Sequence, residues 1–190
     1  MPTAAERGRD VRQRLLAAAT ELIPELGWTA VSTRVLAQRA GVGPGLVHYY
    51  FSSLQALLRE AAVETMRRSL GALGPVLAGA DTPDAAVTMA LGSLDAYSGT
   101  DPTSLLFVET YLASTRDEEL RDELTALVTE VRADLAQALR THGVPAPEQT
   151  AAVLAAAIDG VLLHRALDAG LTSSTVAPVL RRLVNYRKDG

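Results

Sequence analysis

The sequence predicts an all-α protein, and three observations support this fold class. Hydrophobic residues make up 48% of the 190 residues, whereas Phe, Trp and Tyr together make up only 4%. Apolar residues recur at helical spacings of three and four along most of the chain, and strand-like alternation is hard to find. Residues suited to helix starts and ends stand between these periodic stretches. With 21% charged residues, the composition is that of a folded domain rather than of a disordered chain.

The first predicted helix covers residues 10–26. Leu15 and Leu22 belong to an apolar stripe that repeats every three or four residues along this segment. Gly27 follows the last periodic residue, in the place where a glycine commonly ends a helix. Pro24 lies in the last turn, where its missing amide hydrogen removes one backbone donor and should bend the helix.

Two short helices are predicted next. Ser32 is a good N-cap for a helix over residues 32–39, because its hydroxyl can accept a hydrogen bond from a free amide of the first turn. Gly41 should end that helix. Pro44 then begins a second short helix over residues 44–50, at a first position where proline is tolerated.

The helices beyond this point are longer. Residues 52–55 read as a capping box, with Ser52 as the cap and Gln55 reaching back to it. Residues 115–118 form a second predicted capping box of the same kind. The remaining predicted helices cover residues 53–77, 82–97, 101–113, 120–140, 147–169 and 175–185.

Composition also excludes several classes of protein. The absence of cysteine excludes disulfides and thiolate metal sites. The polar N-terminus lacks the apolar core of a signal peptide, and no apolar run reaches the ~18 residues that a membrane helix needs. We therefore expect a cytoplasmic protein without a membrane partner.

Charge is distributed unevenly along the chain. The net charge of −4 by itself argues against nucleic acid as a partner. Residues 1–55, however, carry six Arg against four acidic residues, which is +2 and leaves −6 for the rest. Part of the basic charge lies in the segment RGRDVRQR, residues 7–14, close to the motif described next.

The spacing of the two short helices is that of a helix-turn-helix. A helix of two turns, a break at Gly41-Val42-Gly43 and a second short helix fit this motif. The second helix of such a motif enters the major groove of DNA, which is wide enough for one helix. Gly43, Pro44 and Gly45 are small enough to let the backbone approach DNA closely at the start of that helix.

Three of the eight aromatic residues follow one another in this second short helix, at positions 49–51. Helical phase predicts that Val47 and Tyr50 face inward and pack with Phe51 and Trp28. The residues left to face outward are Leu46, His48 and Tyr49. A tyrosine hydroxyl and an imidazole can both make directional contacts with phosphate oxygens or base edges.

The segment LLAAATELIPELGWTAVSTRVLAQRAGVGPGLVHYYFSSLQALL, residues 15–58, resembles the DNA-binding region of TetR-family transcriptional regulators. That family has a helix ending in glycine next to an aromatic residue, Ser or Thr opening the second helix, an LA..AGV segment and an aromatic-rich recognition helix. The residues at those places are Gly27, Trp28, Ser32, Leu36, Ala37, Ala40, Gly41, Val42, His48, Tyr50 and Phe51.

The resemblance implies a helix-turn-helix domain at residues 1–52 and an effector-binding and dimerisation domain at residues 53–190. It implies a homodimer formed through the last two helices, whose recognition helices lie in successive major grooves of a palindromic, double-stranded operator. The implied DNA contacts are Ser32, Thr33, Arg34, Gly43, Pro44, Gly45, Leu46, His48 and Tyr49.

The resemblance also places a small-molecule effector cavity among the helices of the second domain, lined by apolar and aromatic side chains with few polar groups. The candidate lining residues are Met66, Met89, Tyr97, Phe107, Glu109 and Tyr111. Ordinary core packing is the alternative for the methionines and aromatics, and a surface turn is the alternative for Glu109. We expect no cofactor, no metal and no catalytic site, because the i, i+4 pair His164 and Asp168 offers too few ligands for a metal ion.

The sequence thus predicts a ligand-responsive DNA-binding regulator, a repressor that a small molecule releases from its operator, and not an enzyme. Two alternatives stay open. One is a DNA-binding regulator without a small-molecule effector. The other is a helical carrier or enzyme that kept the fold and lost DNA binding. Leu54 stands where the family usually has a phosphate-binding lysine, and this difference and the net charge of −4 lend slight support to the second alternative.

Overall fold

The protein is all α-helical over the residues described by the computed structural model, 3–185 without the side chains at positions 4, 93 and 94. The predicted fold class is confirmed. None of the helices described combines the length and the apolar character needed to cross a membrane. The α-helices are α1 (Ala4–Leu26), α2 (Thr33–Ala40), α3 (Gly45–Tyr50), α4 (Leu54–Leu70), α5 (Leu73–Ala78), α6 (Pro83–Gly92), α7 (Pro102–Ser114), α8 (Glu118–Thr141), α9 (Pro147–Arg165) and α10 (Ser173–Leu180). Three short 3-10 helices accompany them, η1 (Trp28–Ala30), η2 (Ser93–Ala96) and η3 (Arg181–Leu183).

Packing groups these helices into two compact units. The first unit runs to Arg67 and also includes Leu105–Leu124. The second unit contains Arg68–Ser104 and the residues from Thr125 onward. Helices α4, α7 and α8 therefore each contribute residues to both units. The boundary predicted between residues 52 and 53 divides the chain by function, DNA binding against effector binding and dimerisation, and not by packing. It stays a prediction.

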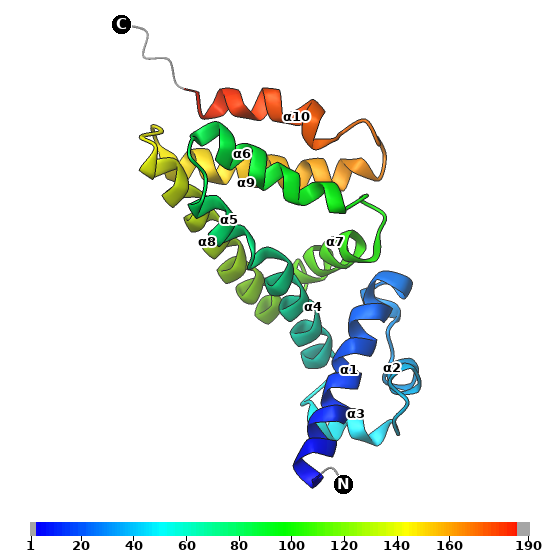
Figure 1. Cartoon of the computed structure of the whole chain (residues 1–190). Helices are drawn as coiled ribbons and strands as arrows, with labels where there is room; N and C mark the ends of the chain where they lie inside the picture. Colours follow the sequence, from blue (N-terminus) through cyan, green and yellow to red (C-terminus); the bar gives the residue numbers. More distant parts are fainter. Residues whose placement is uncertain (1–2, 186–190) are drawn as a thin grey trace, which may run out of the picture. The chain divides into compact units, whose positions relative to one another are not determined.

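The first unit is built around the apolar stripe of α1. Helix α1 packs against α2, and Figure 1 shows α1, α2 and α3 grouped in blue to cyan. Helices α2, α3 and α4 each present buried apolar residues to this core. The side chains with almost no exposed surface include Leu15, Leu22, Ile23, Leu36, Val47, Leu57 and Leu58.

Helix α1 begins six residues earlier than the periodicity predicts. Thr3 is its N-cap, accepting a hydrogen bond from the amide of Glu6 at 3.2 Å, and the Glu6 carboxylate accepts from the amide of Thr3. This reciprocal pair is a capping box. The hydrogen bonds from the backbone and then the side chain of Thr3 lower the pKa of Glu6. The helix continues through Pro24 to Leu26.

Two other predicted helix starts are corrected by one or two residues. Ser53, not Ser52, caps α4 by accepting from the amide of Ala56 at 3.0 Å. Asp117, not Thr115, caps α8 by accepting from the amide of Leu120 at 3.1 Å. In addition, the single helix predicted over residues 53–77 is divided into α4 and α5.

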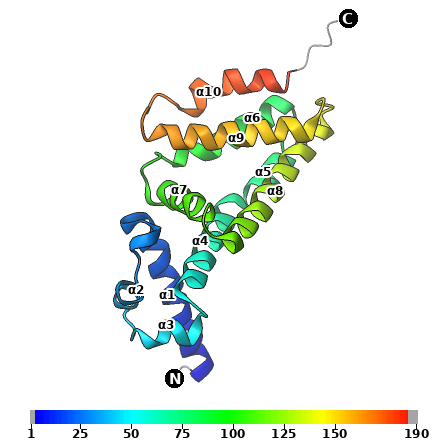
Figure 2. The same ribbon diagram turned by 180° about the vertical axis from the view of Figure 1, so that it is seen from behind.

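The second unit has its own apolar core. In both Figures 1 and 2, α6, α9 and α10 lie alongside one another, and α10 contacts α6 directly. Buried side chains from α6, α8, α9 and α10 form one cluster in this unit. Its least exposed members include Ala86, Leu91, Leu139, Ala151 and Leu154.

A buried arginine closes one end of the second unit. Arg165, only 9% exposed, donates from its guanidinium to the Asp95 carboxylate and to the carbonyl of Tyr97, both at 2.9 Å, and to the carbonyl of Leu171. Hydrogen bonds from the Ser173 hydroxyl, and then from Arg165, lower the pKa of Asp95. A buried charge is tolerated when it is satisfied in this way, so Arg165 joins η2 to the turn after α9.

Candidate DNA-binding site

The start of α2 presents polar groups to the surface. The Ser32 hydroxyl accepts from the amide of Val35 at 3.3 Å, so the predicted N-cap is confirmed. Thr33 is half-buried and Arg34 is exposed. Among the residues described, Arg34 has neither an ion pair nor a hydrogen-bond partner, and its charge is available to a phosphate.

The turn between α2 and α3 depends on one left-handed glycine. Gly41 has φ of 66° and ψ of 37°, a conformation in which an L side chain is strained. The amide of Gly41 donates to the carbonyl of Gln38 at 3.2 Å, and that of Val42 donates to the carbonyl of Ala37 at 3.0 Å. These two bonds end α2 and direct the chain into α3.

Helix α3 places Val47, His48 and Tyr49 as helical phase predicts, whereas Leu46 and Tyr50 are neither fully outward nor fully inward. Val47 is completely buried, and Phe51 and Trp28 are each only 6% exposed. On the outer side, His48 is exposed and Tyr49 is 78% exposed, with its ring edge-on to Tyr50 at 4.9 Å between centroids. The remaining two side chains, Leu46 and Tyr50, are half-buried.

The glycines that flank Pro44 have open space in front of them. A Cβ atom added to Gly43 or to Gly45 would meet no other atom within 4 Å. Neither residue has the positive φ that favours glycine. The local fold therefore does not require glycine at these two positions, whereas a partner that approaches the backbone from outside would.

The arginines of α1 differ in their availability. Arg12 donates from its guanidinium to both carboxylate oxygens of Glu60 and lies over the Phe51 ring at 5.0 Å, and Arg14 pairs with Asp10. Arg9, by contrast, is exposed and has no partner among the residues described.

Arg9 follows a residue of α1 that packs against α3. The neighbouring Gly8 packs against α3, since a Cβ there would lie 3.4 Å from the Tyr50 hydroxyl. Arg9 is therefore a candidate phosphate contact that the sequence interpretation missed. The signal for it was the Thr-x-x-Glu pattern at residues 3–6, which starts α1 early enough to place Arg9 on a helix.

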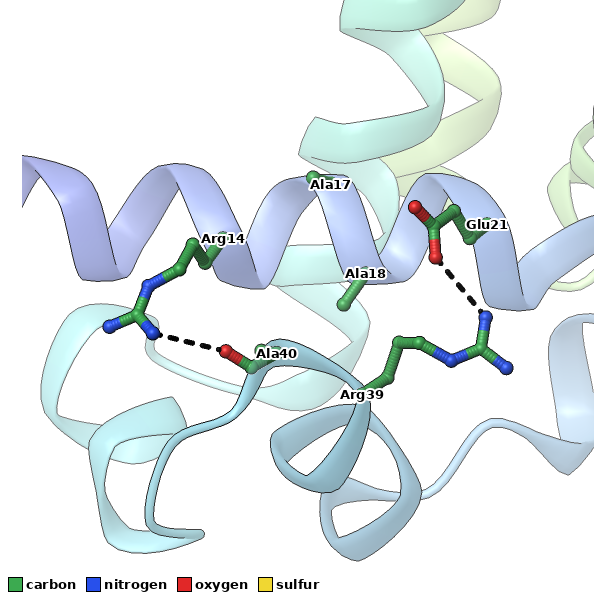
Figure 3. Close-up of a pocket in the computed structure, with 6 residues that line it drawn as sticks. All are labelled: Arg14, Ala17, Ala18, Glu21, Arg39 and Ala40. Atoms are coloured by element: carbon green, nitrogen blue, oxygen red, sulfur yellow. Dashed lines mark hydrogen bonds and ion pairs between the residues drawn. The ribbon is translucent and has the colours of Figure 1, made fainter.

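A shallow pocket lies between α1 and α2, on the same unit (Figure 3). Its floor is formed by alanines, and Figure 3 shows Arg39 reaching Glu21 across one end and Arg14 reaching the carbonyl of Ala40 at the other. Its volume is about 170 Å³, below the roughly 300–1,000 Å³ of typical small-molecule sites. We do not assign the effector to it.

Trp28 fixes the segment that leads from α1 into α2. Its indole N–H donates to Oε1 of Gln55 on α4 at 2.9 Å, and its backbone N–H donates to Oε2 of Glu109 on α7 at 2.8 Å. The predicted capping box does not form because Ser53 caps α4 and Ala56 occupies the third helical position, which leaves the Gln55 side chain to accept from the indole. Helices α4 and α7 both hold the entrance to the helix-turn-helix in place.

The predicted effector residues fall in different places. Met66, Phe107, Glu109 and Tyr111 belong to the first unit, whereas Met89 and Tyr97 belong to the second. Met66 is buried, and Tyr111 is 71% exposed. Phe107, Glu109 and Tyr97 are half-buried, and Met89 is 37% exposed. No single unit brings all six together, and their role in binding stays a prediction.

A capped helix, a glycine turn and a short helix with exposed polar side chains define a helix-turn-helix DNA-binding protein. Comparison with known families agrees. Residues 15–61 match the family described as bacterial regulatory proteins, tetR family, and residues 81–186 match the tetracyclin repressor-like, C-terminal domain. The chain belongs to the TetR family of transcriptional regulators, which are not enzymes.

Individual relatives extend over most of the chain. The HTH-type transcriptional regulator BetI of Rhizobium meliloti (strain 1021) is 32% identical over 163 residues, which is 82% of this chain and 78% of BetI. A transcriptional regulator of Streptomyces coelicolor A3(2) is 29% identical, with a TM-score of 0.75 over 93% of this chain and 99% of its own. A regulator of Saccharomonospora viridis, solved in complex with choline, is 19% identical with a TM-score of 0.78, covering 94% and 97% of the two chains. The last of these shows the fold alone.

Proposed function

We propose that this protein is a homodimeric repressor that binds a palindromic operator and is released from it by a small molecule. The observation that carries the proposal is the surface of α3. Its outer side chains, above all Tyr49, are exposed although the chain has few aromatic residues, and the glycines beside them have open space. Such a surface favours contact with a large, regularly shaped ligand such as the major groove.

The proposed DNA contacts come from the start of α2 and from α3. Ser32, Thr33 and Arg34 stand at the start of α2 and supply hydroxyls and a free guanidinium for phosphates. The other predicted contacts stand at the start and on the outer side of α3: Gly43, Pro44, Gly45, Leu46, His48 and Tyr49. The polar groups at the start of α2 suit contacts with phosphates, and the side chains of α3 suit contacts with base edges.

Dimerisation through α9 and α10 is supported by exposed apolar residues on both helices. On α9, Val153 is 55% and Leu163 is 53% exposed, and a Cβ added to Gly160 would meet nothing within 4 Å. On α10, Val179 is 57% exposed. Apolar faces of this kind, present on adjacent helices of one unit, are the material of a helical dimer interface.

Release by a small molecule requires differential affinity. One arrangement of the dimer fits the operator, and a ligand that binds another arrangement more tightly shifts the population away from DNA. Helix α4 is suited to transmit this change because it contributes residues to both units. The choline complex of the Saccharomonospora viridis regulator supports a small-molecule site in this fold, and choline is a suitable first probe.

The test of DNA binding is selection from a random duplex library, followed by fluorescence anisotropy on the selected duplex and a shuffled control. We expect saturable binding to the selected duplex that weakens by about 10³–10⁵ between 50 and 200 mM salt if the dimer neutralises roughly 6–10 phosphates. The Tyr49→Ala variant should fold and bind more weakly. Failure to select any duplex would favour the helical carrier that has lost DNA binding.

The effector and the dimer have separate tests. Choline should raise the melting temperature of the protein and weaken operator binding if it is an effector. If a wider set of small molecules also does neither, a regulator without a small-molecule effector is favoured. Light scattering should give a dimer for the wild type, and Leu163→Arg should give monomer at low micromolar concentration.

A further inference from the structure

Glu109 is the single charged residue of α7, whose sequence is PTSLLFVETYLAS. It is half-buried, and its Oε2 accepts a hydrogen bond of 2.8 Å from the backbone N–H of Trp28, which is 81 residues away in the chain. The carboxylate also lies close over Gly27, since a Cβ at Gly27 would be 3.6 Å from Oε2. This contact lies entirely within the first unit.

The Trp28 amide is a group that needs an outside acceptor. The amide of Gly27 still bonds back to the carbonyl of Ile23 at 3.0 Å and completes α1. Trp28 is the first residue of η1, and the first amide of a short helix has no acceptor within that helix. Glu109 supplies the acceptor, and an ionised acceptor makes a hydrogen bond roughly twice as strong as a neutral one.

The contact controls the entrance to the helix-turn-helix. After η1 the chain has only Val31, which is 4% exposed, before Ser32 caps α2. The segment from the Trp28 amide to Ser32, the first predicted phosphate contact, is therefore short and held in place. A change in the position of Glu109 is therefore passed to the start of α2.

Helix α7 is also held at its other end. Asp101 accepts hydrogen bonds from the amides of Thr103 and Ser104, both at 3.0 Å, within the second unit. One helix is thus capped in the second unit and bonded to the α1–α2 connection in the first.

We propose that Glu109 is a positioning residue for operator recognition, whose carboxylate holds the Trp28 amide and so fixes the start of the helix-turn-helix. The inference rests on the proposed function as an operator-binding regulator. It assigns Glu109 a role that differs from the effector contact predicted from the sequence.

Two substitutions separate the effect of the Glu109 side-chain length from the effect of its negative charge. Glu109→Gln keeps the length and an acceptor oxygen but loses the charge, whereas Glu109→Asp keeps the charge and is one methylene too short to reach the amide. Glu118→Gln is the matched control, because it removes one negative charge from the same unit at an exposed position. Hydrogen exchange of the Trp28 amide reports the contact directly, and operator affinity is measured on the duplex that the wild type selects.

We expect Glu109→Asp to accelerate exchange at Trp28 by about tenfold or more and to weaken operator binding by about tenfold, with Glu109→Gln between it and the wild type. Glu118→Gln should match the wild type in exchange. The proposal is overturned if both Glu109 variants exchange like the wild type, or if exchange accelerates while operator affinity is unchanged. If the wild type selects no duplex, the proposed function fails, and the exchange measurement still decides whether Glu109 holds Trp28.

Discussion

Gly45→Ala is expected to change stability and DNA affinity in opposite directions. Gly45 is the first residue of α3, it lacks a positive φ, and an added Cβ would meet no atom within 4 Å. Alanine should therefore fit without strain, and the loss of backbone freedom in the unfolded chain should raise the free energy of unfolding by about 0.5–1 kcal/mol. For a chain of this length that corresponds to a rise in melting temperature of about 1–4 °C.

The same methyl group should weaken binding to DNA. If the backbone of α3 approaches the groove at Gly45, the methyl overfills a close contact, and such overpacking typically costs about 1–3 kcal/mol. Operator affinity should then fall by roughly 5- to 150-fold. The assay pairs thermal unfolding with anisotropy on the selected duplex.

Gly92→Ala provides the matched control for this prediction. Gly92 ends α6 in the second unit, it also lacks a positive φ, and a Cβ there would meet nothing within 4 Å. We expect a similar small gain in stability and no change in operator affinity. If Gly45→Ala binds the operator as tightly as Gly92→Ala does, DNA does not approach the start of α3, and the reasoning from open space is wrong.

Three further perturbations test other parts of the structure. Gly41→Ala should lower the free energy of unfolding by about 1–2 kcal/mol in urea titrations, because φ is 66° there, and equal stability would contradict the strain. Arg9→Ala should make the salt dependence of operator binding shallower by about one phosphate per protomer, and an unchanged slope would remove Arg9 from the interface. Burial by itself would raise the pKa of Asp101, but hydrogen bonds from Ser104 and from backbone amides outweigh it and lower the pKa from 3.8 to about 2. The ionised form therefore stabilises the fold above pH ~4. Asp101→Asn should lower the free energy of unfolding by about 1–2 kcal/mol at pH 7 after solvent screening, and this difference should vanish as the pH falls through about 2.

Local signals in the sequence were sufficient for much of the fold and for the outline of the site. The cap at Ser32 and the end of α2 at Gly41 depend on groups within a few residues of each other, and both are found as predicted. The division of α3 into inner and outer side chains follows from helical phase alone, so the burial of Val47 and the exposure of Tyr49 could be predicted.

Features that depend on distant residues could not be predicted. Gln55 lies three residues after Ser52, as a capping box requires, but Ser53 caps the helix and the Gln55 side chain accepts from the distant Trp28 indole. Glu109 lies in an apolar segment that suggests a ligand pocket, yet its acceptor role arises from a backbone amide 81 residues away. Periodicity gives no information about which unit a helix joins, so it could not show that Leu105–Leu124 packs with the N-terminal helices.

That distribution of α7 and α8 has a practical consequence for exchanging parts between relatives. The simplest way to recombine two related regulators is to join the N-terminal segment of one chain to the remainder of the other. Here such a junction after residue 52 would separate Trp28 from Gln55 and Glu109, the two side chains that accept hydrogen bonds from it at 2.9 and 2.8 Å. A chimaera that transplants residues up to Arg67 together with Leu105–Leu124 takes these partners from one parent. We expect it to be more stable than the single-junction chimaera, in which side chains from two parents have to pack against each other.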